Sequence, residues 1–369
     1  MKNPVRVLVV DDSALMRKLI PQILAVDNSI EVVGTAMDGT FGLKKIEDLK
    51  PHVVTLDLEM PGMGGIDTLK EIMRHHRVPV IVVSSHSTEG ASITLKALSL
   101  GAFDFVAKPQ DVSARMPEIA NELIAKIKAA AQSKGVRVAP IASTLRREKS
   151  AQSGKKTPTR VVGIGVSTGG PHALQYVLSQ LPSDFPGTIL IVQHMPEGFT
   201  DMFARRLDEI CAIQVKQAQS GDLLLAGRAL LCPGNRHLKV KRLPLGDVAI
   251  LSDDARVNGH RPSVEVLFKS VAEEFGAEAV ALLMTGMGDD GAEGMGAVKA
   301  AGGMTIAQSE DSCVVFGMPK AAIDRGYAVR VVHLDAMANT LQAQCMPHRG
   351  RPEASPESNR GKSAGVGHD

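Results

Sequence analysis

The second half of the chain contains a serine, a histidine and an aspartate of the types that a hydrolytic relay requires. Ser167, His194 and Asp290 each follow a separate apolar run. A serine hydroxyl becomes a nucleophile when an imidazole takes its proton, and a carboxylate orients that imidazole and stabilises its charged form. Together the three predict acyl transfer, provided that the fold brings them to one place.

A second set of polar residues lies in the first third of the chain. Asp11, Asp12 and Asp57 follow apolar runs, as do Ser84 and Lys108. Carboxylates that are brought together repel one another unless a cation joins them, and Mg²⁺ prefers oxygen ligands. A lysine opposite them can balance charge that is added at the centre. This set predicts an acidic, cation-assisted site.

The elements that must position the acidic set alternate between strand and helix. We expect strands at 5–10, 30–36, 53–56, 79–83 and 103–106, and helices near 13–26, 41–49, 66–76, 88–98 and 117–131. Five βα units in this order predict a doubly wound, five-stranded parallel sheet. Sites in such sheets lie at the carboxyl ends of the strands, where the acidic set falls.

The hydrolytic set requires a second α/β domain with a mainly parallel sheet. Apolar runs at 161–166, 188–193 and 279–284 read as buried strands, and 171–178 has helical spacing. In a parallel sheet the carboxyl ends of the strands share one edge. Residues 27 positions apart (194 minus 167) and 96 positions apart (290 minus 194) can therefore meet there.

The glycine-rich turn around Ser167 admits other readings. Gly163 to Gly169 resembles a dinucleotide fingerprint, but its third glycine is one place late, and the next strand lacks the acid that would bind a ribose. The turn could also be structural only, with His194 a hydrogen-bonded core histidine and Asp290 a helix cap. A hydrolase is favoured because all three residues are expected at one sheet edge.

Composition limits the class of protein. Hydrophobic residues make up 44% and charged residues 22% of the 369 residues, which indicates globular domains. The formal net charge of +2 and the scarcity of aromatic residues (Trp 0, Tyr 2, Phe 9) argue against nucleic-acid binding. No signal peptide or membrane span is visible, so we expect a cytoplasmic protein that is not membrane-inserted.

Shifts in composition divide the chain into four parts. We expect the first domain at 1–125, a linker at 126–159, the second domain at 160–345 and a disordered tail at 346–369. The stretch 145–159 is basic, rich in small residues and broken by glycine and proline, which is typical of a flexible tether.

The first domain resembles the receiver domain of response regulators. The resemblance rests on Asp57-Leu-Glu-Met-Pro-Gly62, Phe105-Val-Ala-Lys-Pro109 and the early acidic pair. It implies that a histidine kinase phosphorylates Asp57 and that Asp11, Asp12 and Asp57 bind Mg²⁺. It also implies that Ser84 and Lys108 contact the phosphoryl group and that Phe105 is a switch residue.

The second domain resembles the catalytic domain of chemotaxis protein-glutamate methylesterases, the CheB family. The matching motifs are Gly165-Val-Ser-Thr-Gly-Gly170, Gln193-His-Met-Pro196, Cys232-Pro-Gly-Asn-Arg-His237, Thr285-Gly-Met-Gly-Asp-Asp-Gly291 and Ala307-Gln-Ser-Glu-Asp-Ser-Cys313. The resemblance implies that Ser167 is the nucleophile, His194 the general base and then acid, and Asp290 the residue that orients it. Thr168 would help to position His194, and the Met287 loop would line the oxyanion site.

The same resemblance implies the substrates and partners. Glutamate methyl esters on methyl-accepting chemoreceptors would be hydrolysed, and receptor glutamines deamidated, without a cofactor in this domain. The histidine kinase CheA would supply the phosphoryl group, and the protein would associate with receptor arrays at the inner membrane. Regulation would follow if the unphosphorylated receiver covered the Ser167 edge. The alternative is a response regulator whose second domain only binds receptors and has no catalytic activity.

Two residues depart from the usual family pattern. Val166 replaces an alanine, and Asp289 stands where the family usually has asparagine before the catalytic acid. A carboxylate beside Asp290 could make the pair titrate together. The sequence therefore predicts that Asp289 shapes the pH profile.

Overall fold

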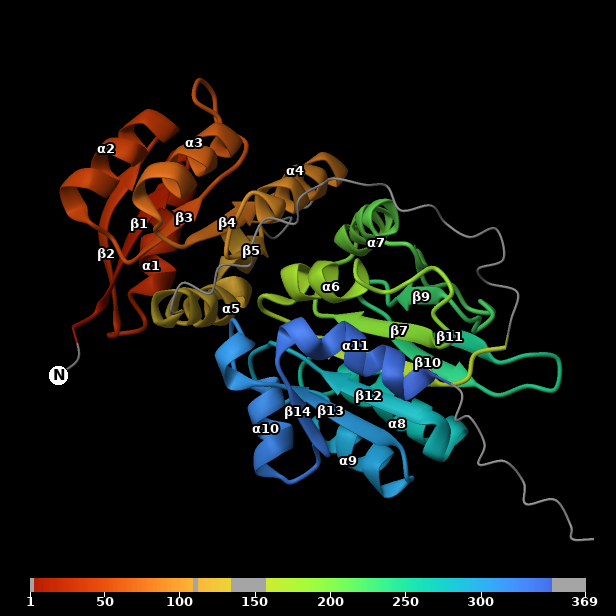
Figure 1. Cartoon of the computed structure of the whole chain (residues 1–369). Helices are drawn as coiled ribbons and strands as arrows, with labels where there is room; N and C mark the ends of the chain where they lie inside the picture. The colour runs from red at the N-terminus through yellow and green to blue at the C-terminus, as the bar shows by residue number, and fades with distance from the viewer. Residues whose placement is uncertain (1–2, 86, 109–111, 134–156, 347–369) are drawn as a thin grey trace, which may run out of the picture.

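The computed structural model describes residues 3–85, 87–108, 112–133 and 157–346. Most of the expected linker and nearly all of the expected tail lie outside these residues. Two α/β units follow each other along the chain, as the ribbon shows (Figure 1). The expected fold class is confirmed for both of them.

The first unit is a five-stranded parallel sheet with strand order β2-β1-β3-β4-β5. Its strands are β1 (Val5–Val10), β2 (Ile30–Ala36), β3 (Val53–Leu56), β4 (Val80–Ser84) and β5 (Asp104–Ala107). Its helices are α1 (Ala14–Leu24), α2 (Gly39–Leu49), α3 (Gly65–Glu71, continued by a π-helical turn at Ile72–His76), α4 (Thr88–Ser99) and α5 (Val112–Gln132). Nearly continuous burial of β1, β3 and β4 explains their uniformly apolar sequences.

Helix α5 occupies the first seven positions of the expected linker, residues 126–132. It ends at Gln132, whereas the linker was expected from residue 126. The reason is packing, because Ile127 and Ala130 are buried against the sheet with α1. The apolar spacing of these residues continues the helix.

The second unit is a seven-stranded parallel sheet with order β14-β13-β12-β6-β7-β9-β8 and a separate antiparallel hairpin, β10-β11. The strands are β6 (Val161–Val166), β7 (Thr188–Gln193), β8 (Gln214–Gln217), β9 (Arg228–Leu231), β10 (His237–Lys241), β11 (Val248–Ser252), β12 (Ala279–Leu283), β13 (Met304–Gln308) and β14 (Arg330–Val332). The helices are α6 (Gly170–Leu178), α7 (Phe199–Ile210), α8 (Val264–Phe275), α9 (Ala292–Ala300), α10 (Met318–Asp324) and α11 (Leu334–Cys345).

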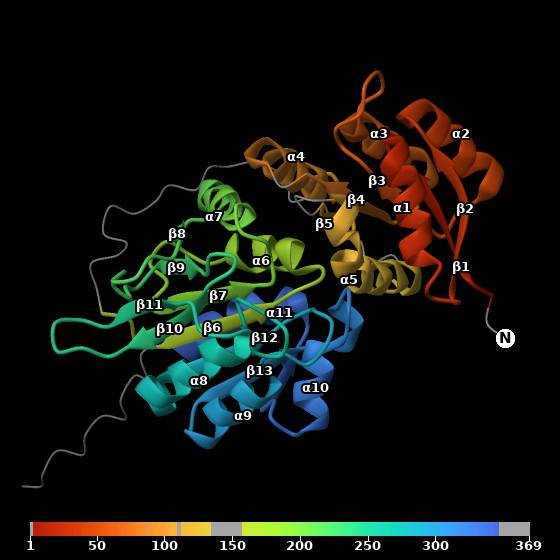
Figure 2. The ribbon, with the colours of Figure 1, turned by 180° about the vertical axis from the view of Figure 1, so that it is seen from behind.

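Helices cover both faces of this sheet (Figures 1 and 2). One face packs on α6, α7 and α11, and the other on α8, α9 and α10. Residues of β6 alternate between the two faces of the sheet. Val162, Ile164 and Val166 face the layer of α6, α7 and α11, whereas Gly163 and Gly165 face α8. Within the described residues, no helix is both long enough and apolar enough to span a bilayer.

The glycines of β6 allow α8 to lie unusually close to the sheet. A Cβ at Gly165 would come within 2.2 Å of Val264 Cγ1 and 2.9 Å of Leu283 Cδ1. At Gly163 it would lie 3.0 Å from the ring of Phe268. The glycine pattern that resembles a nucleotide motif therefore serves helix packing here.

Replacing Gly165 by Ala should destabilise the second unit. The added methyl group overfills the contact with Val264, so we expect the free energy of unfolding to fall by about 1–3 kcal/mol. Urea unfolding followed by tyrosine fluorescence reports on this unit, because Tyr176 and Tyr327 both belong to it. Gly163→Ala should cost less, and a Gly165→Ala midpoint equal to that of the wild type would contradict the packing argument.

Candidate active site

The structure brings Ser167, His194 and Asp290 to the carboxyl edge of the second sheet. Strands β6 and β7 pair Val166 with Gln193, so Ser167 and His194 are the next residues on neighbouring strands. The other neighbour of β6 is β12, and the Ser167 N–H donates to the Thr285 carbonyl beyond it (3.0 Å). Parallel register thus unites segments that are far apart in the sequence.

His194 uses its two ring nitrogens differently. Nε2 lies 2.8 Å from Asp290 Oδ2, whereas Nδ1 is buried and has no hydrogen-bond partner among the described residues. The carboxylate therefore fixes the proton on Nε2 and leaves the Nδ1 lone pair free. A free lone pair on an oriented imidazole is what a general base requires.

Asp290 is buried at the N-terminus of α8. Oδ1 accepts hydrogen bonds from Ser263 Oγ (2.7 Å) and the Glu265 N–H (3.3 Å), and Oδ2 accepts one from the Val264 N–H (2.7 Å). Burial acts to raise the pKa of Asp290, but His194, Ser263 and the Val264 N–H outweigh it and hold the pKa below its ordinary value. The carboxylate is therefore ionised and can stabilise the positive charge that His194 gains when it accepts a proton.

Two glycines shape the surroundings of Ser167. Gly169 has a φ of +76° at the start of α6, a conformation that favours glycine. A Cβ at Gly286 would lie 2.9 Å from Ser167 Cβ, so only glycine lets this loop approach the serine so closely. The same loop carries the exposed Met287, whose N–H donates to no backbone acceptor within the described residues. An N–H near the serine can hold a developing oxyanion.

Thr168 is buried beside Ser167, but its expected link to His194 is not formed. Its carbonyl accepts a hydrogen bond from Thr285 Oγ1 (2.9 Å). In the part of the chain that the structure describes, its hydroxyl makes no hydrogen bond to His194. Thr168 thus joins the serine turn to the loop after β12.

A segment that no sequence pattern assigned to the site completes it. Asn258 Nδ2 lies 3.4 Å from Asp290 Oδ1, and the His260 ring stacks on His194. An Asn-Gly pair at 258–259 marks a tight turn and Ser263 precedes a helix, so both signals were present. Neither signal indicates that the turn lies against a sheet edge.

Asp289 does not face Asp290. Its Oδ2 lies 2.8 Å from Arg325 Nη2 on the exposed side of the loop. Successive residues in this turn point to opposite sides, and a guanidinium neutralises the outer one. The expected coupling between the two carboxylates therefore has no geometric basis.

The acidic set of the first unit also converges. One carboxylate oxygen from each of Asp11, Asp12 and Asp57 lies within 4.8 Å of the others, so the three could hold a metal ion. Lys108 Nζ is 2.7 Å from Asp57 Oδ2 and 3.2 Å from Asp11 Oδ2. Burial raises the pKa of Asp57 and of Asp11, although Lys108 opposes the shift. A bound cation would relieve this cost of burying carboxylates.

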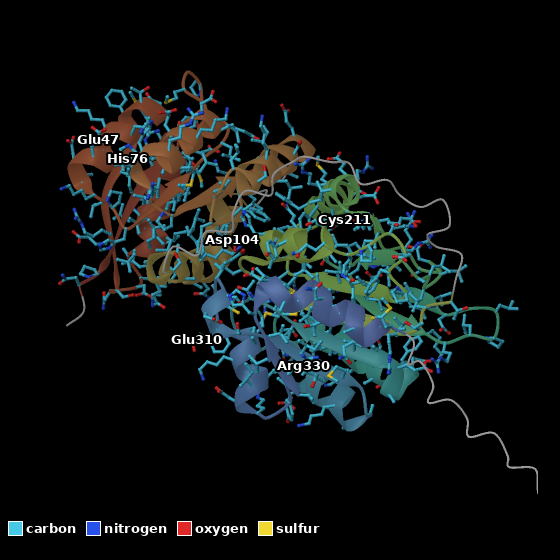
Figure 3. All side chains as sticks on the ribbon, viewed as in Figure 1. Glu47, His76, Asp104, Cys211, Glu310 and Arg330 are labelled. Carbon is cyan, nitrogen blue, oxygen red and sulfur yellow. The ribbon has the colours of Figure 1, made fainter. Side chains whose placement is uncertain are left out.

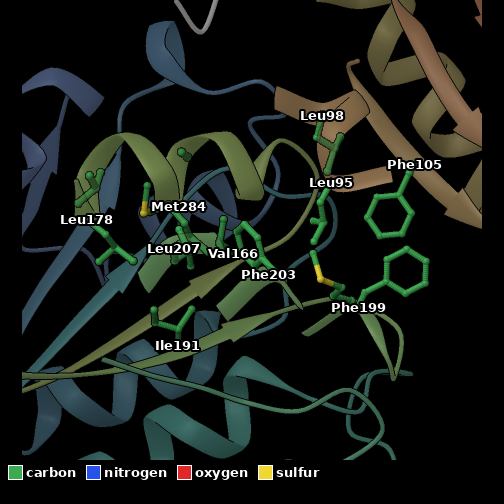
Figure 4. Packing of buried hydrophobic residues seen from close by; sticks show 14 of the residues in the cluster. Leu95, Leu98, Phe105, Val166, Leu178, Ile191, Phe199, Phe203, Leu207 and Met284 are labelled. Carbon is green, nitrogen blue, oxygen red and sulfur yellow. The ribbon is translucent and has the colours of Figure 1, made fainter. Parts of the chain in front are cut away.

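Ser84 ends β4, and Phe105 lies on the neighbouring strand β5. The Ser84 hydroxyl donates to the Gly90 carbonyl (3.2 Å) rather than into the acidic centre. Phe105 is buried and stacks on Phe199 of the second unit, with ring centroids 4.9 Å apart and an interplanar angle of 17°. The residue that resembles the receiver switch is thus part of the contact between the two units (Figure 4).

This contact forms one apolar cluster across both units. Leu95 and Leu98 of α4 and Phe105 of β5 belong to the same cluster as Phe199 and Phe203 of α7 (Figure 4). His172 at the start of α6 adds a polar contact, with Nε2 2.6 Å from the Leu98 carbonyl. Asp104, next to Phe105, lies at the same junction (Figure 3). The first unit therefore packs against segments that directly follow Ser167 and His194.

Comparisons with known proteins agree with this architecture. The sequence-family model for the response regulator receiver domain matches residues 7–119, and the family model for the CheB methylesterase matches residues 162–341. A crystal structure of the Thermotoga maritima CheB methylesterase catalytic domain is 38% identical and covers 51% of this chain and 99% of its own, with a TM-score of 0.50.

Curated relatives match nearly the whole chain. Protein-glutamate methylesterase/protein-glutamine glutaminase 2 of Koribacter versatilis is 62% identical, over 94% of this chain and 98% of its own length. The protein-glutamate methylesterase/protein-glutamine glutaminase of Symbiobacterium thermophilum is 45% identical, over 92% of this chain and 97% of its own. The chain belongs to the CheB methylesterase family, in the form that carries an N-terminal receiver domain.

Proposed function

We propose that this protein is a phosphorylation-regulated hydrolase that removes methyl groups from glutamate methyl esters of chemoreceptors. The observation that carries the proposal is the His194–Asp290 hydrogen bond beside Ser167, in a chain whose relatives are named for this activity. The relatives' second named activity, protein-glutamine glutaminase, uses the same acyl chemistry with ammonia as the leaving group.

The residues would act as follows. Ser167 Oγ attacks the ester carbonyl carbon while His194 Nδ1 accepts its proton, and Asp290 stabilises the resulting imidazolium. The imidazolium then protonates the departing oxygen, which gives methanol and an acyl-serine. A water molecule, deprotonated by His194, hydrolyses that ester to release the glutamate side chain and restore Ser167.

Developing charge on the carbonyl oxygen also needs a donor. The Met287 N–H is suited to this role because Gly286 brings its loop against Ser167. Thr168 holds the other side of the same loop through Thr285. We assign the oxyanion site to this loop, and we propose that the reaction in this domain uses no cofactor.

The receiver would control this chemistry through Asp57. A histidine kinase of the CheA type would donate the phosphoryl group, with Asp11, Asp12 and Asp57 holding Mg²⁺, which would neutralise charge on that group. Lys108 already contacts Asp57 and would contact the phosphoryl oxygens, and Ser84 would turn toward them from Gly90.

The contact between the units supports a masking mechanism. Phe105 stacks on Phe199, five residues after His194, and α4 contacts the start of α6 near Ser167. A receptor helix bundle has to approach this edge to reach the nucleophile. Repacking around Asp57 would move Phe105, weaken the stack and open the edge. The protein would then act at receptor arrays on the cytoplasmic side of the membrane.

Ser167→Ala should abolish methanol release from radiomethylated receptor membranes. Loss of the nucleophile removes the covalent pathway, so we expect a fall of at least about 10⁴-fold in kcat. Receptor binding, measured by co-sedimentation, should remain as in the wild type. Retained hydrolysis would refute the proposed nucleophile, and a wild-type protein that binds receptors without releasing methanol would support the non-catalytic alternative.

Asp290→Asn should lower kcat by about 10⁴-fold, because an amide neither fixes the His194 tautomer nor stabilises the imidazolium. The neighbouring Asp289→Asn is the matched control, since its side chain faces Arg325. We expect this control to keep the wild-type rate and pH profile. If Asp289→Asn shifts the pH profile, Asp289 and Asp290 titrate together and the conclusion drawn from their opposite orientations is wrong.

Removing residues 1–150 should raise hydrolysis several-fold above that of the unphosphorylated full chain, because the receiver contact is lost. The isolated domain is a folded unit in the Thermotoga maritima relative, of which this chain covers 99%. Asp57→Asn in the full chain should remain at the low rate when a small-molecule phosphodonor is added. A truncated protein no faster than the full chain would defeat the masking mechanism.

A further inference from the structure

The imidazole of His194 is covered on one face by a second histidine. The His260 ring lies parallel to it, with centroids 4.0 Å apart and an interplanar angle of 5°. At the edge of the same ring, His194 Nε2 is hydrogen-bonded to Asp290. Its ring is therefore held both at the edge and on the face, and His194 exposes only 11% of its side chain.

A tight hairpin turn holds His260 in place. Val257 and His260 exchange backbone hydrogen bonds of 3.1 and 2.9 Å, and between them Asn258 and Gly259 have φ angles of 52° and 78°. Two positive φ angles in an Asn-Gly turn are the signature of a two-residue hairpin, which is a rigid connection.

The same segment also holds the carboxylate. Asn258 lies 3.4 Å from Asp290 Oδ1, and Ser263 and Val264 bind that carboxylate a few residues later. One stretch of chain thus fixes Asp290 and covers His194. The imidazole and its carboxylate keep their mutual geometry because both are held by this stretch.

His260 is suited to lie against an imidazole that becomes charged. Burial, reinforced by the neighbouring His194, lowers the pKa of His260 to about 4, so the ring is neutral near pH 7. Asp290 and Glu122 of α5 favour its charged form, and Arg256 opposes it. A neutral ring places its electron-rich face against the cation without repelling it.

We propose that His260 is a positioning residue for the hydrolysis, whose ring face holds His194 in the plane that serves Ser167 and Asp290 and stabilises the imidazolium. This inference rests on the proposed function and adds a residue to its machinery. His260 exchanges no proton with the substrate in this role. Its contribution is the orientation of the base and the support of its charge.

The step that His260 supports is the transfer of the Ser167 proton to His194. If the imidazole can rotate or tilt, its Nδ1 lone pair leaves the direction of the hydroxyl, and displacements of about 1 Å reduce catalytic rates by up to about 100-fold. A stacked ring resists tilting, whereas the single Nε2 hydrogen bond leaves rotation about its own axis open. The face contact therefore removes a motion that Asp290 alone permits.

The test compares His260→Ala and His260→Phe in the full-length protein with a phosphodonor present. The readouts are kcat and KM for methanol release from radiomethylated receptors, and the thermal midpoint Tm as a check of folding. We expect the alanine variant to lose at least about tenfold in kcat with KM unchanged. The phenylalanine variant retains a flat ring and should recover most of the loss. His76→Ala, at a partly exposed histidine on the receiver (Figure 3), is the matched control.

Two outcomes would overturn the proposal. The first is a His260→Ala protein with the wild-type kcat. The second is a His260→Phe protein that folds like the wild type yet is as slow as the alanine variant, since a ring nitrogen rather than the ring face would then matter. If His260→Ala fails to fold, His260→Leu, which has a similar volume but no flat ring, takes its place, and a kcat equal to that of His260→Phe would overturn the proposal.

A second readout separates this inference from the proposed function. The rate at which an alkyl fluorophosphonate labels Ser167 depends on the serine–imidazole pair and not on receptors. We expect slower labelling in His260→Ala and near-normal labelling in His260→Phe. A wild type that is labelled but releases no methanol would refute the proposed substrate while leaving His260 testable. Equal labelling of the wild type and the alanine variant would refute the role of His260.

Discussion

The catalytic edge depends on one buried carboxylate at the start of a helix. Asp290 is removed from water, which by itself would favour its protonated form, yet the N-terminus of α8 and His194 supply enough hydrogen bonds to keep it charged. Without that helix end, the carboxylate would be neutral or exposed. In neither state could it orient an imidazole.

The helix end reaches Asp290 because two residues of β6 beneath α8 are glycines. Gly165 and Gly163 face α8, and the space they leave is filled by Val264 and Phe268 of that helix. A glycine-rich strand is often taken as a sign of nucleotide binding, and here the same pattern brings a helix N-terminus to a catalytic acid. Packing and chemistry are therefore served by the same residues.

Among the described residues, the two units meet through apolar packing and the His172–Leu98 hydrogen bond, with no ion pair between them. Phe105 of the receiver stacks on Phe199 of the second unit, with Lys126 over its ring (5.3 Å) and Asp104 beside it in the chain. If Phe105 repacks, its neighbours in the apolar cluster that spans both units must also shift, because close-packed buried side chains have few alternative arrangements. Such a contact is suited to an all-or-none response.

The sequence by itself determined the two α/β units, their parallel sheets and the residues that converge at each edge, because apolar periodicity is local and parallel strands share an edge. It also predicted the acidic centre around Asp57. Only the tertiary structure decided that Asp289 faces a cation and that His260 covers His194. Each of these depends on contacts between distant segments, whose directions no local pattern encodes.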